Sequence, residues 1–232
     1  MPPILTEFSG LRRLELFNST LASWATDASV TEHFHPVLRA IRFVKTNMSS
    51  LPPGLVHART PRSLNVFRMM GGNLTSLPAE LGDLWSSKQF ATIQVTYTQL
   101  QTLPLSFGRI LVNERDLIRN LLEEFPDDLW ATAKLTRLWL SDNPLRRLPR
   151  TIGDVSALVE VAIEDTFVEE VPAWMLEWLT ATATKPSVVV ALRGSPLCNA
   201  MAADKWARAC ARSRQTDILL EMPFLYAQRP FD

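Results

Sequence analysis

Three histidines and two acidic pairs are the side chains in this sequence that could carry acid–base or metal chemistry. His33 and His35 lie two positions apart and His57 follows later, but no set of cysteines or carboxylates stands near them at metal-ligand spacing. The acidic pairs at 123–124 and 127–128 could divide the roles of general acid and base. Solvated loop charges on either side of a proline explain these acidic pairs better. We therefore predict surface histidines and exposed loop charges rather than a catalytic or metal site.

Motifs that would support an enzyme are missing from the sequence. It contains no GxxxxGK[ST], GxSxG, HExxH, GxGxxG or CxxC pattern, so phosphate cradles, hydrolase elbows and zinc sites have no support. Lys plus Arg and Asp plus Glu number 24 each, so the formal charge is zero and the basic excess needed for nucleic-acid binding is lacking. We predict no enzymatic activity, no cofactor, no bound metal and no nucleic-acid partner.

Leu-Pro pairs, or close equivalents, recur along the chain at a nearly fixed interval. Their prolines are spaced by 26, 26, 22, 23 and 23 residues and are Pro52, Pro78, Pro104, Pro126, Pro149 and Pro172. Counting back from Pro149 gives the pattern LxxLxLxxNxLxxLP, which begins at Leu135. A period of this size indicates a solenoid, in which each unit buries its apolar residues only by stacking on the next.

The same frame fits most of the chain. Apolar residues fill positions 1, 4, 6, 11 and 14 of the units that end at Pro52, Pro78, Pro104 and Pro172. A first unit from Leu11 and a last one around Val190 look like terminal repeats. Positions 4 and 6 alternate with polar neighbours, as in a strand with one buried face. Position 9 should hydrogen-bond to the turning backbone, and it is occupied by Ser19, Thr46, Gly72, Thr98, Asn120, Asn143, Thr166 and Ser195.

This pattern resembles the leucine-rich repeat family, specifically the LPxxIGxL subtype of Ras-group and plant intracellular repeat proteins. Leu81-Gly82, Phe107-Gly108 and Ile152-Gly153 follow their prolines at the spacing of that subtype. The resemblance covers roughly residues 11–198, or about eight repeats. It implies an α/β right-handed solenoid shaped like a horseshoe, with one parallel β-strand per repeat on the concave face and loops, 3₁₀ turns or short helices on the convex face. We predict a single domain over residues 1–232, with a C-terminal helical cap and tail at 199–232.

One unit, at residues 110–125, departs from the pattern. Counting back from Pro126 places Arg115 at position 4, which puts a charge in a core slot. Apolar pairs at 117–118 and 121–122 have the spacing that a helix would use. We favour a distorted repeat over a helix because the proline spacing is unbroken across this unit.

The two cysteines, Cys198 and Cys210, are 12 residues apart in the expected cap. The Pro-Leu-Cys string resembles the closing unit of the family, and the Ala-rich stretch 200–212 is typical of a helix laid over the last repeat. An oxidising compartment would allow a disulfide between the two cysteines, whereas cytosol would leave two small buried thiols. The sequence leaves both alternatives open.

Positions 2, 3, 5, 7 and 8 should point away from the core and tile the concave face. Their charged residues comprise six positive and one negative in the first three units, but two positive and six negative in units five to seven. Such a bipolar face would orient a partner of matching polarity. Large apolar side chains on this face could anchor a partner or simply cover one another across strands. We predict partner contacts at Arg42, Arg68, Tyr97, Trp139 and Glu164.

Three N-glycosylation sequons begin at Asn18, Asn47 and Asn73, at the strand-to-turn edge of the first three units. They favour an extracellular setting, or a place in a larger membrane protein. No signal-peptide pattern and no run of 18 apolar residues occurs, which favours a cytoplasmic protein without membrane insertion. We predict a cytoplasmic, monomeric protein–protein interaction module that serves as a scaffold or adaptor in signalling. The alternative is the ligand-sensing ectodomain, or a fragment, of a leucine-rich repeat receptor.

Overall fold

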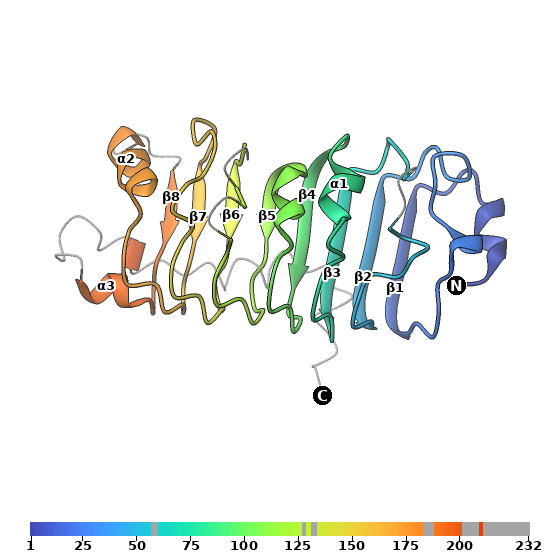
Figure 1. The fold of residues 1–232 in the computed structure, drawn as a ribbon, viewed down its shortest axis with the longest axis horizontal. Helices are drawn as coiled ribbons and strands as arrows, with labels where there is room; N and C mark the ends of the chain where they lie inside the picture. Colours follow the sequence, from blue (N-terminus) through green and yellow to red (C-terminus); the bar gives the residue numbers. More distant parts are fainter. Residues whose placement is uncertain (57–59, 127–128, 131–133, 183–187, 201–208, 211–232) are drawn as a thin grey trace.

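The computed structural model describes residues 1–56, 60–126, 129–130, 134–182, 188–200 and 209–210. Its strands stand side by side in chain order, from the N-terminal end of the molecule to the C-terminal end (Figure 1). Helices and irregular segments connect each strand to the next. This is the coil-by-coil stacking that the proline spacing predicts.

One parallel sheet of eight strands runs through the described residues, in the order β1 to β8. The strands are Arg13–Thr20 (β1), Ala40–Asn47 (β2), Val66–Gly72 (β3), Gln89–Thr96 (β4), Leu111–Asp116 (β5), Arg137–Trp139 (β6), Glu160–Ala162 (β7) and Val189–Ala191 (β8). The register aligns the same repeat position in every unit, so that Ile41 pairs with Phe67 and Phe67 with Ile93. Each repeat position therefore forms a row across the sheet.

The core lies behind the sheet, where positions 4 and 6 point inward. Leu138, Leu140 and Leu145, which define the frame in the best-fitting unit, are all fully buried. Full burial of one such side chain contributes roughly 1.5–3 kcal/mol, so the continuous apolar rows supply most of the stability of the solenoid.

Short helical segments precede, connect and follow the strands. They are the 3₁₀ turns Pro3–Glu7 (η1), Thr26–Ala28 (η2) and Leu105–Arg109 (η3), and the helices Leu81–Trp85 (α1), Ala173–Thr182 (α2) and Pro196–Ala200 (α3). Two glycines allow neighbouring coils to approach closely on this side. A Cβ atom on Gly82 would lie 1.6 Å from the carbonyl oxygen of Ser106, and one on Gly108 would lie 1.5 Å from that of Leu129. These contacts explain physically why glycine follows the proline at this spacing.

Position 8 of every unit holds a residue in the left-handed conformation. The φ angles lie between 45° and 76° at Asn18, Lys45, Gly71, Tyr97, Arg119, Asp142, Asp165 and Gly194. Left-handed geometry costs roughly 1–2 kcal/mol for a residue with a side chain. In the later units the stack holds it in place, because the position-8 amide donates to the position-7 carbonyl of the next unit, as from Asp142 to Glu164 at 2.9 Å.

The doubtful unit at 110–125 is a distorted repeat, because β5 pairs in register with β4 and β6. Arg115 occupies the core slot beside Ile93 and Leu138 and is completely buried. Its Nη2 donates to the carbonyl of Ile110 at 2.9 Å, and its guanidinium lies 5.6 Å from the ring centre of Phe107. Burial lowers the pKa of Arg115 to about 9. The expected charge in the core is therefore present.

At the C-terminal end the structure joins Cys198 and Cys210 in a disulfide. The amide of Leu192, directly after β8, donates to the carbonyl of Ala209 at 2.9 Å, so the chain at 209–210 lies against the last strand. Helix α3 includes residues 199–200, the first two residues of the expected cap. The rest of the predicted cap helix, and the tail to residue 232, lie outside the described residues apart from 209–210.

Candidate partner-binding surface

The concave face of the sheet is tiled by rows of the same repeat position. The position-5 row runs from β1 to β8 as Glu15, Arg42, Arg68, Gln94, Asp116, Trp139, Ala162 and Ala191. It starts with charged residues and ends with apolar ones. The two halves of this face therefore differ in the chemistry that they offer.

Arg42 and Arg68 are register neighbours at the N-terminal half of the row. Nη1 of Arg42 lies 2.9 Å from Oε1 of Glu15, and the Arg42 side chain is 25% exposed. Glu15 also lies 3.6 Å from Nε of Arg13. Two predicted contacts thus stand side by side as a basic patch, and Arg42 is paired with Glu15 within the sheet.

Cross-strand hydrogen bonds and ion pairs form a polar ladder through the position-3 row. Thr92 donates to Oε2 of Glu114 at 3.1 Å, Arg137 pairs with Glu114, and Nε of Arg137 lies 3.5 Å from Oε2 of Glu160. Sequence reasoning counted these charges but missed their pairing. The shared repeat position was the available signal, because parallel register places such residues opposite one another.

Tyr97 lies at the rim of the face, because it is the left-handed position-8 residue after β4. The guanidinium carbon of Arg119 stands 5.1 Å from the centre of its ring, and Arg119 in turn pairs with Asp142 at 3.1 Å. Burial raises the pKa of Tyr97, which Arg119 opposes and Asp142 reinforces. Tyr97 is therefore separated from Arg42 and Arg68, at the edge of the same surface.

Trp139 and Glu164 require a correction. They were expected to be exposed contacts, but Trp139 is 7% and Glu164 only 1% exposed. Trp139 belongs to an apolar cluster with Ile118, Ala162 and Ala191 that is separate from the main core and lies on the concave side of β5 to β8. Repeat position correctly predicts the face on which a residue lies, but it carries no information about what covers that face.

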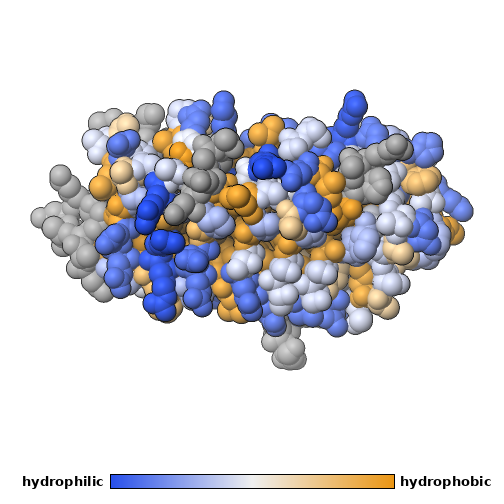
Figure 2. Space-filling view, viewed as in Figure 1, coloured by the Kyte–Doolittle hydropathy of each residue, from blue (hydrophilic) through white to orange (hydrophobic). Residues whose placement is uncertain are grey.

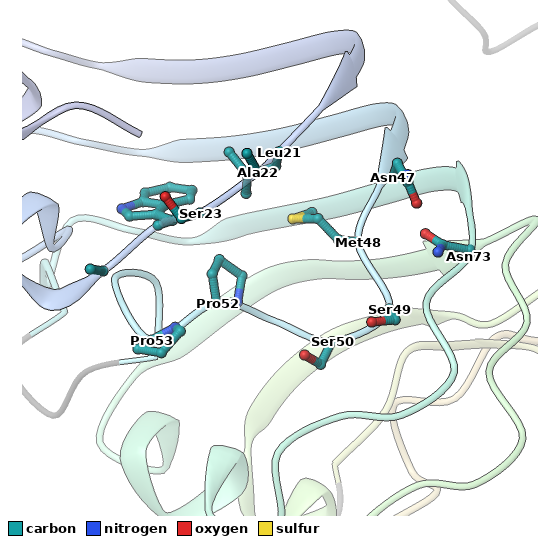
Figure 3. Close-up of a pocket in the computed structure, with 12 residues that line it drawn as sticks. Leu21, Ala22, Ser23, Asn47, Met48, Ser49, Ser50, Pro52, Pro53 and Asn73 are labelled. Carbon is teal, nitrogen blue, oxygen red and sulfur yellow. The ribbon is translucent and has the colours of Figure 1, made fainter.

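The three sequons differ in exposure. Asn18 and Asn47 are exposed, whereas Asn73 is half-buried and its Oδ1 has no hydrogen-bond partner among the described residues. Figure 3 shows Asn47 and Asn73 next to each other in a groove between the first coils. The groove encloses about 450 Å³ and is lined by Leu21, Ala22, Ser23, Trp24, Ala25, Asn47, Met48, Ser49, Ser50, Pro52, Pro53 and Asn73. No titratable side chain lines it, so it offers no acid–base chemistry.

The described histidines and acidic residues that were considered for acid–base or metal chemistry do not form a common site. His35 was expected at the surface but is fully buried, because its Nε2 lies 2.9 Å from the carbonyl of Leu5 beneath η1. His33 is exposed, and Glu124 pairs with Arg147 at 3.2 Å. His57 and the acidic pair 127–128 lie outside the described residues. Within the described part of the chain, no group of three His, Cys, Asp or Glu residues could hold a metal ion.

Comparisons with known proteins rest on structure alone. No protein-family profile and no curated protein sequence matches the chain. A chain of the Toll–Spatzle complex of Drosophila, in its glycosylated form, superposes with a TM-score of 0.63 at 20% identity, over 84% of this chain and 25% of that one. The protein has the leucine-rich repeat solenoid fold. This confirms the fold class expected from the proline spacing, while the LPxxIGxL subtype stays a prediction.

Two further solved leucine-rich repeat proteins give lower TM-scores. The leucine-rich effector YopM of Yersinia pestis gives a TM-score of 0.44 at 20% identity, over 79% of this chain and 49% of that one. A leucine-rich repeat protein of Leptospira interrogans gives 0.30 at 13% identity, over 83% of this chain and 74% of that one. The chain thus spans a quarter of the Toll complex chain and about half of YopM. No helix among the described residues is long and apolar enough to cross a membrane.

Proposed function

We propose that this leucine-rich repeat protein is a protein–protein interaction module whose concave sheet binds a protein partner. The observation that carries the proposal is the division of this face into a basic half, with Arg42 and Arg68 adjacent, and a half with acidic and apolar side chains on β5 to β8. Complementary charge on a partner would steer its approach and fix its orientation. In this proposal the module is a cytoplasmic, monomeric scaffold or adaptor in signalling, with no catalytic step and no cofactor.

Tyr97, Trp139 and Glu164 take different roles in the proposal. Tyr97 lies at the rim beside Arg119 and would contact a partner that extends past the strand ends. Trp139 and Glu164 are buried in the structure, so they would contact a partner only after a local rearrangement exposes them. The first contacts of an approaching partner would therefore fall on the basic half, at Arg42 and Arg68.

The test is a binding measurement with charge-reversal variants of the full chain. Proteins captured with wild type are identified, and their affinities are then measured for Arg42→Glu/Arg68→Glu and for the control Arg109→Glu. Arg109 is exposed on η3, away from the sheet, and pairs with Asp83. We expect at least a tenfold loss of affinity for the double variant and no change for the control. Equal affinities for all three proteins would contradict the proposal.

A second candidate function, the ectodomain of a ligand-sensing receptor, is favoured by two observations. The disulfide Cys198–Cys210 suits an oxidising compartment, and Asn18 and Asn47 expose their side chains to solvent at sequons. Intact mass after expression in a secretory host is the test. We expect glycans at Asn18 and Asn47 before Asn73, and their loss in Asn18→Gln/Asn47→Gln. An unmodified wild-type mass would contradict the receptor hypothesis and leave the scaffold hypothesis standing.

A further inference from the structure

Strand β1 is the outermost strand at the N-terminal end of the sheet, and no described residue outside β2 makes a backbone hydrogen bond to it. The carbonyl of Arg12 accepts from the amide of Ala40 at 3.4 Å, so the backbone groups of residues 12, 14 and 16 point toward β2. Backbone groups alternate in direction along a strand, which leaves the N–H and C=O groups of Arg13 and Glu15 pointing away from the sheet. These groups form a row of donors and acceptors at which a further strand could pair.

The apolar layer behind β1 is also partly open. Leu16 at position 6 is only partly buried, whereas Phe43 and Met69 at the same position in β2 and β3 are fully buried. Leu11 and Leu21 in the first unit are likewise partly buried. Each inner coil has a neighbour on both sides, and at the other end the chain at 209–210 lies beside β8. The outer side of the first coil therefore lacks the cover that every other described coil has.

Further apolar side chains are exposed at this end. Ile4 and Phe8, in and directly after η1, are 53% and 52% exposed, whereas Leu5 between them is buried. The amide of Leu11 donates to the carbonyl of Phe8 at 3.0 Å, which holds Phe8 beside the first repeat. Figure 2 shows hydrophobic groups between hydrophilic ones at the end of the molecule where Figure 1 shows η1. An apolar surface thus accompanies the unpaired strand edge, and one added strand would cover part of it.

The register of the sheet indicates the apolar residues that such a strand needs. Positions 4 and 6 of neighbouring strands lie opposite each other, as Leu14 does to Ile41 and Leu16 to Phe43. An added segment that continues these rows carries apolar side chains two residues apart on the side that faces the core. Its other side chains would extend the concave face.

The charges around the start of β1 indicate what the polar positions of the segment should carry. Arg12, Arg13 and Arg39 are all exposed there. In the described part of the chain, the one ion pair that these three arginines make joins Arg13 to Glu15 at 3.6 Å. A partner with acidic side chains at this place would be attracted, and one with basic side chains would be repelled.

We propose that the open edge of β1 binds an extended acidic segment of a protein partner, which pairs with β1 as an additional strand. The proposal goes beyond the proposed function, because this site is a backbone edge and not the side chains of the concave face. Main-chain hydrogen bonds to Arg13 and Glu15 provide binding, while alternate apolar side chains on Leu14 and Leu16 provide selectivity. A second copy of the chain fits this edge less well. Figure 1 shows η1 beyond β1, so the η1 segments of two copies would meet before their β1 edges could pair.

Titration of the full chain with synthetic peptides tests the edge. The probe is a peptide of about ten residues that alternates valine with threonine or glutamate, as a strand with one apolar face requires. A control peptide carries lysine in place of glutamate. Two further versions of the glutamate peptide are N-methylated on one or the other alternating set of amides, so that each version removes the donors from one edge of the peptide only.

Variants of the chain separate the backbone from the side chains. Glu15→Pro removes an outward N–H that the ladder with β2 does not use, and proline is tolerated at such a position of an edge strand. Glu15→Gln is its matched control, since it loses the same charge and keeps the N–H. Arg13→Glu reverses the charge beside the edge, and Arg109→Glu, on η3 away from the sheet, is the control for that reversal. Urea denaturation shows whether each variant is folded.

We expect the glutamate peptide to bind Glu15→Gln and Arg109→Glu at least as tightly as wild type, and Glu15→Pro and Arg13→Glu at least tenfold more weakly. The lysine peptide should bind wild type at least tenfold more weakly than the glutamate peptide. One N-methylated version should keep its affinity and the other should lose it. In the complex, the amides of Arg13 and Glu15 should exchange with solvent at least tenfold more slowly.

The proposal would be overturned by a glutamate peptide that does not bind, by equal affinities of the two N-methylated versions, or by unchanged exchange of the two amides. These three measurements use wild type, so they decide the matter even if Glu15→Pro does not fold. A dimer of the chain without peptide, dispersed by Glu15→Pro, would assign the edge to a second copy and also overturn the proposal. The peptides read the strand edge and not Arg42 or Arg68, so such a failure leaves the proposed function to its own test.

Discussion

Strands β1 to β4 run for seven or eight residues each, whereas β6 to β8 run for three. The coils between Pro52 and Pro104 are also longer, since successive prolines there are 26 residues apart, against 22 or 23 from Pro104 to Pro172. In β1 and β2 the pairing continues through position 9, where Ser19 lies opposite Thr46. The N-terminal half is thus held together by backbone pairing over a longer stretch. The C-terminal half has to stabilise its turns in another way.

Buried asparagines do this in the C-terminal half. Nδ2 of Asn143 donates to the carbonyls of Leu117 and Leu140, both at 2.9 Å, and its Oδ1 accepts from the amide of Leu122 at 3.1 Å. Asn120 makes equivalent bonds one unit earlier. Each side chain joins two coils. By contrast, the hydroxyl of Thr46 at the same position in β2 is buried without a hydrogen-bond partner among the described residues.

The cores of the two halves differ as well. A chain of aromatic contacts crosses the wider N-terminal coils, from Trp24 to Phe43, Phe67, Trp85 and Phe90, with ring centres 5.1 to 6.2 Å apart. The corresponding inward positions of β6 to β8 hold aliphatic side chains such as Leu138 and Val161. Longer coils enclose more volume, and large rings fill it. One repeat pattern thus accommodates two kinds of core packing.

Truncating the aromatic chain should give the largest effect. We expect Phe67→Ala to lower the free energy of unfolding by about 3–5 kcal/mol, because the ring is buried between Phe43 and Trp85 and its loss leaves a cavity. Leu138→Ala, at the same repeat position in β6, should cost about 2–5 kcal/mol and less than Phe67→Ala. Urea denaturation of both variants measures the difference. A larger loss for Leu138→Ala would remove the distinction between the two cores.

Arg115 lies where the two halves meet, and its replacement should stabilise the protein. Arg115→Met removes a buried charge that has no carboxylate partner among the described residues, and we expect a gain of about 1–4 kcal/mol at neutral pH. Burial lowers the pKa of Arg115 to about 9 in the folded protein, well below the ordinary value that it has in the unfolded chain. The unfolded state therefore binds more protons between these values, so wild-type stability should rise relative to the variant above pH 9. Denaturation at pH 7 and pH 10.5 tests both statements, and a destabilised variant would show that the cation–π contacts dominate.

The side-chain hydrogen bonds of the buried asparagines should stabilise the C-terminal half, whereas Thr46 at the same repeat position should add no such stability to the N-terminal half. Asn143→Ala breaks several buried hydrogen bonds and should lower the free energy of unfolding by about 1–3 kcal/mol. Thr46→Val replaces an unbonded hydroxyl with a methyl group of similar shape and should be neutral or slightly stabilising. Chemical denaturation of the two single variants measures both. Equal losses would mean that position 9 works in the same way throughout the sheet.

The periodicity of the sequence was sufficient to predict the strands and the inward rows, including the strand that carries Arg115. It predicted these because every unit repeats the same physical requirement, an apolar side chain at a fixed register. It failed for features that are made by a single long-range contact. His35 is buried against η1, where it contacts the carbonyl of Leu5. Trp139 and Glu164 are buried although their repeat positions predict exposed side chains. The positions of these residues in the repeat do not indicate that their side chains are buried.

The ion pair between Glu15 and Arg42 should give the smallest effect. Both side chains are partly exposed, at 34% and 25%, so a double-mutant cycle with Glu15→Gln and Arg42→Gln should give a coupling of about 0.2–1 kcal/mol that weakens with added salt. The corresponding cycle for Arg137 and Glu160 in the C-terminal half should give a stronger coupling that is less sensitive to salt, because Glu160 is only 7% exposed. Denaturation at low and high ionic strength measures both cycles. If the Glu15–Arg42 coupling equals or exceeds the other, the basic half is as strongly paired as the C-terminal half, and Arg42 loses its advantage as the first contact for a partner.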